Sequence, residues 1–203
     1  MIKQVAVIGT GMMGPGIAML AARAGYPTRL IGRSEGSIAR GLAAVDRALE
    51  EMCAHGIYGD EDVERIKENL TATTDLVAGV EDADFVVESI VEDLAVKQEL
   101  FAKLDQLCPP KTILATNTSG LSPTKIGSAT RRPDRVVATH FWNPPHLVPL
   151  VEVGRGEKTS QETVEAACYL MERMQKKAVV VQKDILGFIG NRLQHALFRE
   201  AIS

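Results

Sequence analysis

Cysteine and aromatic residues are scarce in this chain. Its 203 residues include three cysteines, Cys53, Cys108 and Cys168, which lie far apart and form no C-x-x-C pair. The sequence therefore predicts neither a disulfide framework nor a zinc knuckle, and a reducing compartment fits it best. Aromatic residues make up 4% of the chain, which argues against an aromatic stacking platform for single-stranded nucleic acid.

An excess of charge and a long apolar run are also missing. Lysine and arginine number 23 against 26 aspartates and glutamates, so the formal net charge is −3 and a strongly basic nucleic-acid binder is excluded. No segment approaches the roughly 20 apolar residues of a membrane span, and the first residues show no signal-peptide features. We therefore expect a soluble, cytoplasmic protein that binds neither nucleic acid nor membranes.

Short apolar runs alternate with helical patterns along the chain. This alternation is typical of a parallel sheet covered by helices, so we expect an α/β fold of the Rossmann type, with a doubly wound, mostly parallel sheet. The expected strands are residues 2–8, 28–31, 85–87, 112–115, 135–139, 147–153 and 178–181. The expected helices between them are residues 14–24, 94–107 and 162–176.

A helical hairpin is expected after the second strand. In residues 37–55 the apolar side chains recur at helical spacing, and residues 60–69 continue as a second amphipathic segment. The turn between them contains Gly56 and Gly59. This hairpin is an insertion into the strand–helix alternation.

The pattern Gly9-Thr10-Gly11-Met12-Met13-Gly14 is G-x-G-x-x-G, placed after an apolar strand and at the start of a helix. In that position Gly9 permits a tight turn, Gly11 lets a pyrophosphate approach the backbone, and Gly14 lets helix and strand pack closely. The helix N-terminus then offers free N–H groups to the phosphate. We predict a dinucleotide site formed by Gly9, Gly11, Met12, Met13 and Gly14.

The choice between NAD and NADP depends on the end of the second strand. An NAD enzyme has an acid there that binds the ribose 2′-OH, but this chain has Gly32. Arg33 and Ser34 follow it, and an arginine can pair with a 2′-phosphate. We therefore expect an NAD(P) cofactor, with NADP favoured. The alternatives are that Glu35 takes the place of the acid after a one-residue shift, or that Arg33 is simply a solvated turn residue.

The end of the chain reads as the start of a further helix, over residues 187–203. We expect a dinucleotide-binding domain over residues 1–184 and, over 185–203, the first helix of an otherwise absent C-terminal helical domain. An apolar stripe that the chain has little left to cover favours self-association, most simply as a homodimer. The stripe consists of Ile189, Leu193, Ala196, Leu197 and Ala201.

Several further motifs occur in order after the glycine loop, and with them the chain resembles the NAD-binding domain of the short-chain L-3-hydroxyacyl-CoA dehydrogenase family of fatty acid metabolism. The motifs are Val87-Glu88-Ser89-Ile90-Val91-Glu92-Asp93-Leu94-Ala95-Val96-Lys97, Ala115-Thr116-Asn117-Thr118-Ser119, His140-Phe141-Trp142-Asn143-Pro144, Leu150-Val151-Glu152-Val153 and Gly187-Phe188-Ile189-Gly190-Asn191-Arg192. The resemblance implies a nicotinamide-dependent dehydrogenase that transfers a hydride between its cofactor and the 3-hydroxy or 3-oxo group of a 3-hydroxyacyl-CoA. It implies a general base at His140, an orienting carboxylate at Glu152, substrate contacts from Ser119 and Asn191, and cofactor contacts from Asn143, Asn117, Ser119, Glu92 and Lys97.

Elementary chemistry is consistent with those roles. Oxidation of a secondary alcohol needs a base for the hydroxyl proton while a hydride leaves, and histidine titrates near neutral pH. His140 follows an apolar strand, at the edge of a parallel sheet where ligands bind, and Glu152 on the next strand-like run can orient its ring. The amide of Asn143 and the hydroxyl of Ser119 suit a carbonyl oxygen that gains negative charge.

Other chemistries fit poorly. The spacing of His140, His146 and Glu152 matches no zinc signature, so we expect no metal. The sequence Thr118-Ser119-Gly120 is not a G-x-S-x-G elbow, which argues against a serine hydrolase.

Two departures from the family keep the substrate open. Residues 46–51 are acidic and offer only Arg47 where the family presents serine and lysine to CoA, and residues 143–149 resemble those of lambda-crystallin, L-gulonate dehydrogenase and carnitine dehydrogenase. A small free 3-hydroxy acid is therefore an alternative substrate. A cofactor-binding module that is inactive without the missing domain is an alternative function.

Overall fold

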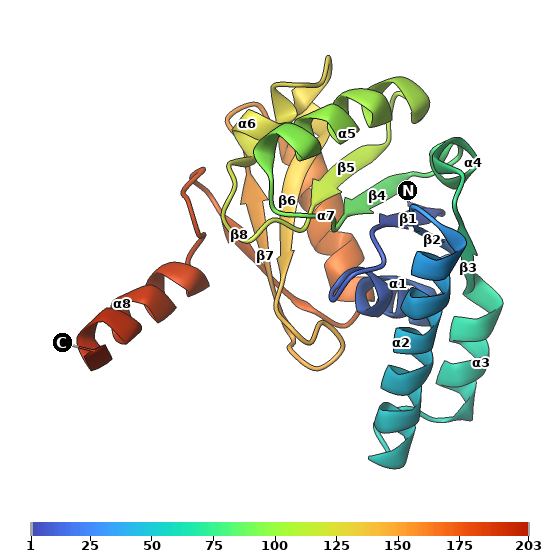
Figure 1. The fold of residues 1–203 in the computed structure, drawn as a ribbon. Coiled ribbons are helices and arrows are strands. Elements are labelled where there is room, and N and C mark those ends of the chain that lie inside the picture. Colours follow the sequence, from blue (N-terminus) through green and yellow to red (C-terminus); the bar gives the residue numbers. More distant parts are fainter. Residues whose placement is uncertain (1, 203) are drawn as a thin grey trace.

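The computed structural model describes residues 2–202, and its strands form one eight-stranded sheet (Figure 1). Met1, where the expected first domain begins, and Ser203, where the expected last helix ends, lie outside the described residues. The strand order is β3-β2-β1-β4-β5-β6-β7-β8. The strands are β1 (Val5–Ile8), β2 (Thr28–Ile31), β3 (Leu70–Thr73), β4 (Phe85–Glu88), β5 (Ile113–Thr116), β6 (Val136–Phe141), β7 (Leu150–Arg155) and β8 (Lys177–Val181).

Neighbouring strands run parallel except at one pair, β6 and β7, which are antiparallel. From β1 the chain builds the sheet toward one edge through β2 and β3, and it then returns to build toward the other edge from β4 onward. The point at which the strand order reverses therefore lies between β1 and β4, as in a doubly wound fold. This confirms the predicted Rossmann-type α/β fold. The helices are α1 (Gly14–Arg23), α2 (Glu35–Ala54), α3 (Asp60–Asn69), α4 (Leu76–Val80), α5 (Leu94–Leu107), α6 (Pro123–Gly127), α7 (Gln161–Arg173) and α8 (Gly190–Ile202), with a 3₁₀ turn at Pro133–Arg135.

The sheet is buried on both faces, and alternate residues of β1 show this directly. Val5 and Val7 pack with Ile17 of α1 and Leu170 of α7 in one core cluster. Ala6 and Ile8 face the other way and belong to a cluster with residues of α5 and α6. Burial on both sides explains why the central strands are uniformly apolar rather than alternating.

The predicted helical hairpin is present as α2 and α3, which Figure 1 shows at one edge of the molecule. A third cluster holds it to α1, in which Met19 packs against Val45, Met52 and Ile66. The hairpin returns the chain to β3, an edge strand paired with β2 that we did not predict.

Helix α8 stands away from the sheet (Figure 1), and none of its residues is buried. Leu193 is 63% exposed, Leu197 is 70% exposed and Ile202 is 86% exposed. The apolar stripe that we predicted is thus uncovered within residues 2–202. No described helix is both long and apolar enough to cross a membrane.

Candidate active site

The loop between β1 and α1 has the backbone that the glycine pattern predicts. Gly9 has a φ of +117°, and a Cβ there would lie 2.2 Å from the carbonyl oxygen of Ser89. A Cβ on Gly14 would lie 1.9 Å from the carbonyl oxygen of Gly9. Both positions therefore require glycine. A Cβ on Gly11 would meet no described atom within 4 Å, so this stretch of backbone is open to close approach.

Helix α1 begins directly behind this loop, and its first turn has no side-chain cap. Met13 is the N-cap residue and provides no side-chain hydrogen bond, while the neighbouring Met12 is 79% exposed. Uncapped N–H groups at a helix N-terminus attract an anion. The glycine cradle and this helix end together fit the pyrophosphate of a dinucleotide.

Gly32, at the end of β2, is tightly surrounded. A Cβ there would lie 2.8 Å from Cγ1 of Ile38 and 2.8 Å from Oγ of Ser37, so an acidic side chain would require both neighbours to move. The carboxylate of Glu35 accepts a hydrogen bond from Oγ1 of Thr74, at 3.3 Å. In this arrangement Glu35 is directed toward the loop after β3, which disfavours the idea that it replaces the acid missing at Gly32.

Ser34 caps helix α2, and Arg33 precedes it. The Ser34 hydroxyl accepts a hydrogen bond from the backbone N–H of Ser37 at 3.3 Å, and Ser37 in turn accepts from the N–H of Ser34. Arg33 is exposed and has no hydrogen bond or ion pair with any residue between 2 and 202. Its guanidinium is therefore available to an anion at the end of β2.

His140 and Glu152 face each other across the antiparallel pair β6 and β7. They are register partners in the sheet, and Nδ1 of His140 lies 2.8 Å from Oε2 of Glu152. Both side chains are buried, at 6% and 2% exposure. The carboxylate therefore fixes the orientation of the imidazole ring, and the second ring nitrogen, Nε2, has no partner among the described residues.

The other oxygen of Glu152 binds the chain that leads into α8. Its Oε1 accepts hydrogen bonds from the backbone N–H groups of Ile189, at 2.9 Å, and Gly190, at 3.0 Å. Burial alone would raise the pKa of Glu152, but the hydrogen bonds from Gly190, His140 and Ile189 hold it below its usual value. Glu152 is thus an ionised carboxylate that can stabilise a protonated imidazole.

Aromatic rings surround the imidazole of His140. The ring of Phe188 is stacked on it with centroids 5.5 Å apart, and the ring of Trp142 is tilted against it at 5.3 Å. A Cβ on Gly190 would lie 2.3 Å from Trp142, so the start of α8 packs closely on this indole. The imidazole of His140 is therefore packed against apolar aromatic rings.

The predicted contact residues Ser119 and Asn191 lie together, although 72 positions separate them in the sequence. The side-chain amide of Asn191 donates to the carbonyl oxygen of Ser119 at 3.0 Å. Asn117 accepts a hydrogen bond from the backbone N–H of Phe141 at 2.9 Å and donates to Oγ of Ser89 at 3.2 Å. Asn117 therefore connects the carboxyl ends of β4 and β5 to the strand of His140.

Glu92 and Lys97 belong to a network centred on Glu88, which our sequence analysis did not single out. The Lys97 side chain is 1% exposed, and its amine lies 2.5 Å from Glu88 and 3.4 Å from Glu92. Oε1 of Glu92 accepts from the backbone N–H of Ser119 at 2.9 Å. Although burial would raise the pKa of Glu92, the hydrogen bond from Thr118, the charge of Lys97 and two backbone N–H groups hold it below its usual value. The network positions the loop after β5 that carries Ser119. The one feature of the sequence that could have indicated this network is Glu88, a charged residue at the end of an apolar strand.

The loop after β6 carries Asn143, which is exposed and whose backbone peptide bond to Pro144 is cis. Lys176 holds this loop in place, because its amine donates hydrogen bonds to the carbonyl oxygens of Pro145, at 2.5 Å, and Val148, at 3.0 Å. Burial lowers the pKa of Lys176 to about 8, and the nearby charge of Arg23 adds to the effect. Nothing in the sequence pattern distinguished this lysine.

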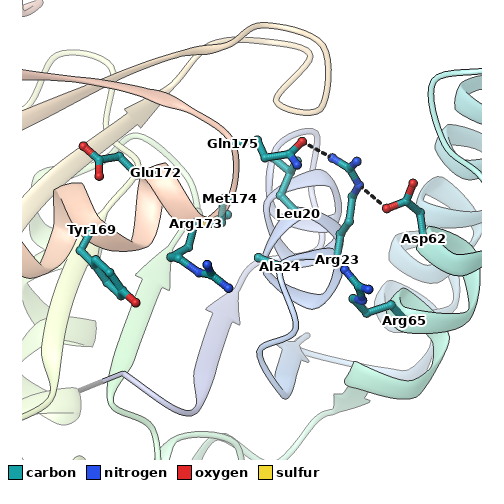
Figure 2. A pocket seen from close by; sticks show the side chains of 10 residues that line it. All are labelled: Leu20, Arg23, Ala24, Asp62, Arg65, Tyr169, Glu172, Arg173, Met174 and Gln175. Atoms are coloured by element: carbon teal, nitrogen blue, oxygen red, sulfur yellow. Dashed lines mark hydrogen bonds and ion pairs between the residues drawn. The ribbon is translucent and has the colours of Figure 1, made fainter.

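One hollow, of about 340 Å³, lies elsewhere, between α1, α3 and the end of α7 (Figure 2). Arg23 crosses it and donates to Asp62 at 2.9 Å and to Gln175 at 2.8 Å. Arg65 of α3 also lines it. None of the predicted site residues is part of this hollow.

Comparisons with known proteins agree with the geometry. The model of a family described as "3-hydroxyacyl-CoA dehydrogenase, NAD binding domain" matches residues 4–185. A probable 3-hydroxybutyryl-CoA dehydrogenase of Bacillus subtilis is 41% identical over 201 residues, which are 99% of this chain and 69% of the relative. The mitochondrial hydroxyacyl-coenzyme A dehydrogenase of Homo sapiens is 39% identical over 206 residues, which are 99% of this chain and 65% of the relative.

Solved structures show the same likeness. The 3-hydroxybutyryl-CoA dehydrogenase of Escherichia coli has a TM-score of 0.94 at 38% identity, over 99% of this chain and 42% of that one. An NAD⁺-dependent 5-formyl-3-hydroxy-2-methylpyridine 4-carboxylic acid 5-dehydrogenase has a TM-score of 0.90 at 35% identity, over 100% of this chain and 64% of that one. On the match over residues 4–185 and these similarities, the chain belongs to the family of 3-hydroxyacyl-CoA dehydrogenase NAD-binding domains.

Proposed function

We propose that this chain transfers a hydride between a nicotinamide dinucleotide and the 3-hydroxy or 3-oxo group of a 3-hydroxyacyl-CoA. The observation that carries the proposal is the buried pair of His140 and Glu152, 2.8 Å apart. One ring nitrogen of His140 is committed to the carboxylate, and the other has no partner among the described residues. This arrangement supports a general base that Glu152 orients.

In the oxidation, Nε2 of His140 accepts the proton of the substrate hydroxyl as the C–H bond breaks and the C=O bond forms. The nicotinamide ring, when bound, supplies the acceptor for the hydride. The carboxylate of Glu152 then stabilises the imidazolium cation, which returns the proton in the reverse reaction. Ser119 and Asn191, which lie together, are proposed to contact the substrate, while Asn143, Asn117, Glu92 and Lys97 are proposed to serve the cofactor side.

The test is an absorbance assay that follows the oxidation of NADH or of NADPH as acetoacetyl-CoA is reduced. Turnover that His140→Gln lowers by roughly 10²–10⁴-fold supports the proposal. No turnover with either cofactor, in a protein that still binds one of them, would instead favour a cofactor-binding module that needs further helices. That alternative is supported by the uncovered face of α8.

A free 3-hydroxy acid is the second candidate substrate. The acidic residues 46–51 on α2 are poorly suited to the phosphates of CoA. The relative 5-formyl-3-hydroxy-2-methylpyridine 4-carboxylate 5-dehydrogenase of Mesorhizobium japonicum, 36% identical over 203 residues, has a name that includes no CoA thioester. Acetoacetate in parallel with acetoacetyl-CoA separates the two, because the preferred substrate has the higher kcat/KM.

NADP is the proposed cofactor in preference to NAD, and the crowding at Gly32 and the unpaired guanidinium of Arg33 support it. The variant Gly32→Asp with Arg33→Ala is expected to favour NAD, and Arg33→Ala alone avoids the steric conflict at Gly32. Tenfold tighter binding of NAD by the unmodified protein, equal to about 1.4 kcal/mol, would refute the preference.

We also retain the predictions of a homodimer and of a cytoplasmic location, although some relatives are named mitochondrial enzymes.

A further inference from the structure

A second arginine, Arg40, lies beside the first turn of α2. Its Nη1 atom is 3.7 Å from the place where a Cβ on Gly36 would be, so the side chain runs back toward the N-terminus of the helix. This is the direction in which helical side chains tend to point. The guanidinium therefore lies over the same turn that Ser34 caps and that Arg33 precedes.

The glycine loop borders this turn through Thr10. A Cβ on Gly41, the residue after Arg40, would lie 3.1 Å from Cβ of Thr10, and a Cβ on Gly32 would lie 3.1 Å from Cγ2 of Thr10. Thr10 is thus wedged between the end of β2 and the second turn of α2. The adenosine ribose of a dinucleotide bound to a Rossmann fold lies next to the end of β2.

Arg33 and Arg40 are both exposed, and neither forms a hydrogen bond or ion pair with any residue from 2 to 202. The nearby acid, Glu35, is held by Thr74. Two unpaired guanidinium groups near the start of α2 match a phosphate monoester, which carries about −1.5 to −2 charges at neutral pH. A ribose 2′-OH would offer them little.

We propose that Arg40 is a specificity-determining residue which, together with Arg33, forms the subsite for the 2′-phosphate of NADP. The inference rests on the proposed preference for NADP. It adds a residue from the second turn of α2 that no motif indicated. Gly36 has a part in it, because the absence of a side chain there leaves room in front of the Arg40 guanidinium.

The test measures dissociation constants of NADPH, NADH and 2′,5′-ADP by fluorescence and calorimetric titration. Arg40→Ala is expected to weaken NADPH and 2′,5′-ADP about tenfold and to leave NADH within about twofold. Arg40→Lys should recover part of the loss. Arg65→Ala, which removes an exposed arginine of α3 away from the site, is the matched control and should change none of the three constants.

Three outcomes contradict the inference. Unchanged NADPH binding in Arg40→Ala removes Arg40 from the subsite, and equal weakening of NADPH and NADH shows a general effect on the cofactor. Tighter binding of NADH than NADPH by the unmodified protein refutes the subsite together with the NADP preference. By contrast, selective binding of 2′,5′-ADP without turnover of acetoacetyl-CoA supports the inference while the proposed dehydrogenase activity fails.

Discussion

At the scale of single residues, the proposed chemistry depends on His140. His140→Gln removes the proton acceptor but keeps a polar side chain of similar size beside Glu152. We expect kcat to fall by roughly 10²–10⁴-fold, the usual contribution of a general base, with the dissociation constant of the cofactor unchanged. Steady-state kinetics and a cofactor titration on the same preparation measure both. A variant with the rate of the unmodified protein would exclude His140 as the base.

Glu152 makes stability depend on pH as well as orienting the base. Its pKa lies below the ordinary value of 4.5, so folding favours the ionised form. The stabilisation is therefore complete above about pH 4.5 and is lost as the pH falls through the lower pKa of the folded state.

Glu152→Gln removes that ionised form, leaving the backbone N–H groups of Ile189 and Gly190 with a weaker acceptor or none. At pH 7 we expect the free energy of unfolding to fall by about 1–3 kcal/mol. The difference from the unmodified protein should narrow in acid, which urea unfolding at a series of pH values measures. A difference that stays constant down to about pH 2 would show that the charge of Glu152 is not what stabilises the fold.

Sequence reasoning at this scale predicted roles for residues whose type indicates a chemistry, such as His140 and Glu152, and the structure brings these two side chains together. It did not find Glu88 or Lys176. Both act through buried hydrogen bonds to partners that are distant in the sequence, Lys97 and Thr116 for Glu88 and the carbonyl oxygens of the Asn143 loop for Lys176. No local pattern records such partners.

At the scale of elements, the turn between β1 and α1 gives two contrasting substitutions. Gly14→Ala places a methyl group 1.9 Å from the Gly9 carbonyl oxygen, so the helix must move away from the strand. We expect a loss of at least about 1–3 kcal/mol in the free energy of unfolding, together with loss of dinucleotide binding.

Gly11→Ala is the matched control, because its methyl group meets no described atom within 4 Å. It should unfold at nearly the same temperature as the unmodified protein but bind the dinucleotide more weakly, since the methyl group occupies the path of the pyrophosphate. Thermal unfolding and cofactor titration separate the two effects. Equal loss of stability in both variants would mean that the two glycines do not differ as the geometry indicates.

The elements that the sequence predicted best are those with a strong period or a long apolar run. The ranges of β2, α3 and α5 are as expected, and α2 spans Glu35–Ala54 where we expected residues 37–55. The strand β3 and the short helices α4 and α6 were missed. The strand Leu70–Thr73 has no fully buried residue, and each of the two helices has five residues, too few for a helical period to show. The last helix starts at Gly190, because Gly187 and Phe188 have positive φ and form a turn before it.

At the scale of the whole molecule, we expect the uncovered apolar face of α8 to pack against a second copy of the chain. Leu193 and Leu197 are more than half exposed on a helix with no buried residue. The double variant Leu193→Asp/Leu197→Asp puts charge into any contact formed there, which is costly when buried.

We expect light scattering to give about twice the monomer mass for the unmodified chain and the monomer mass for the double variant, with cofactor binding retained in both. Gln194→Asp, which adds a charge at an exposed polar position of the same helix, should leave the mass of the unmodified chain unchanged. If the unmodified chain stays monomeric at high concentration, the predicted homodimer is contradicted.

The two oxygens of Glu152 have a consequence for where this protein can be cut. One oxygen contacts Nδ1 of His140, and the other accepts hydrogen bonds from the backbone at Ile189 and Gly190, while Phe188 stacks on the same imidazole. A fragment ending at residue 184, the expected domain boundary, would keep every described strand. It would lose the Phe188 ring that stacks on His140, and Oε1 of Glu152 would lose both of its backbone hydrogen bonds. A minimal dinucleotide-binding fragment can end there, but a fragment that keeps the proposed acid–base pair intact has to extend through Gly190.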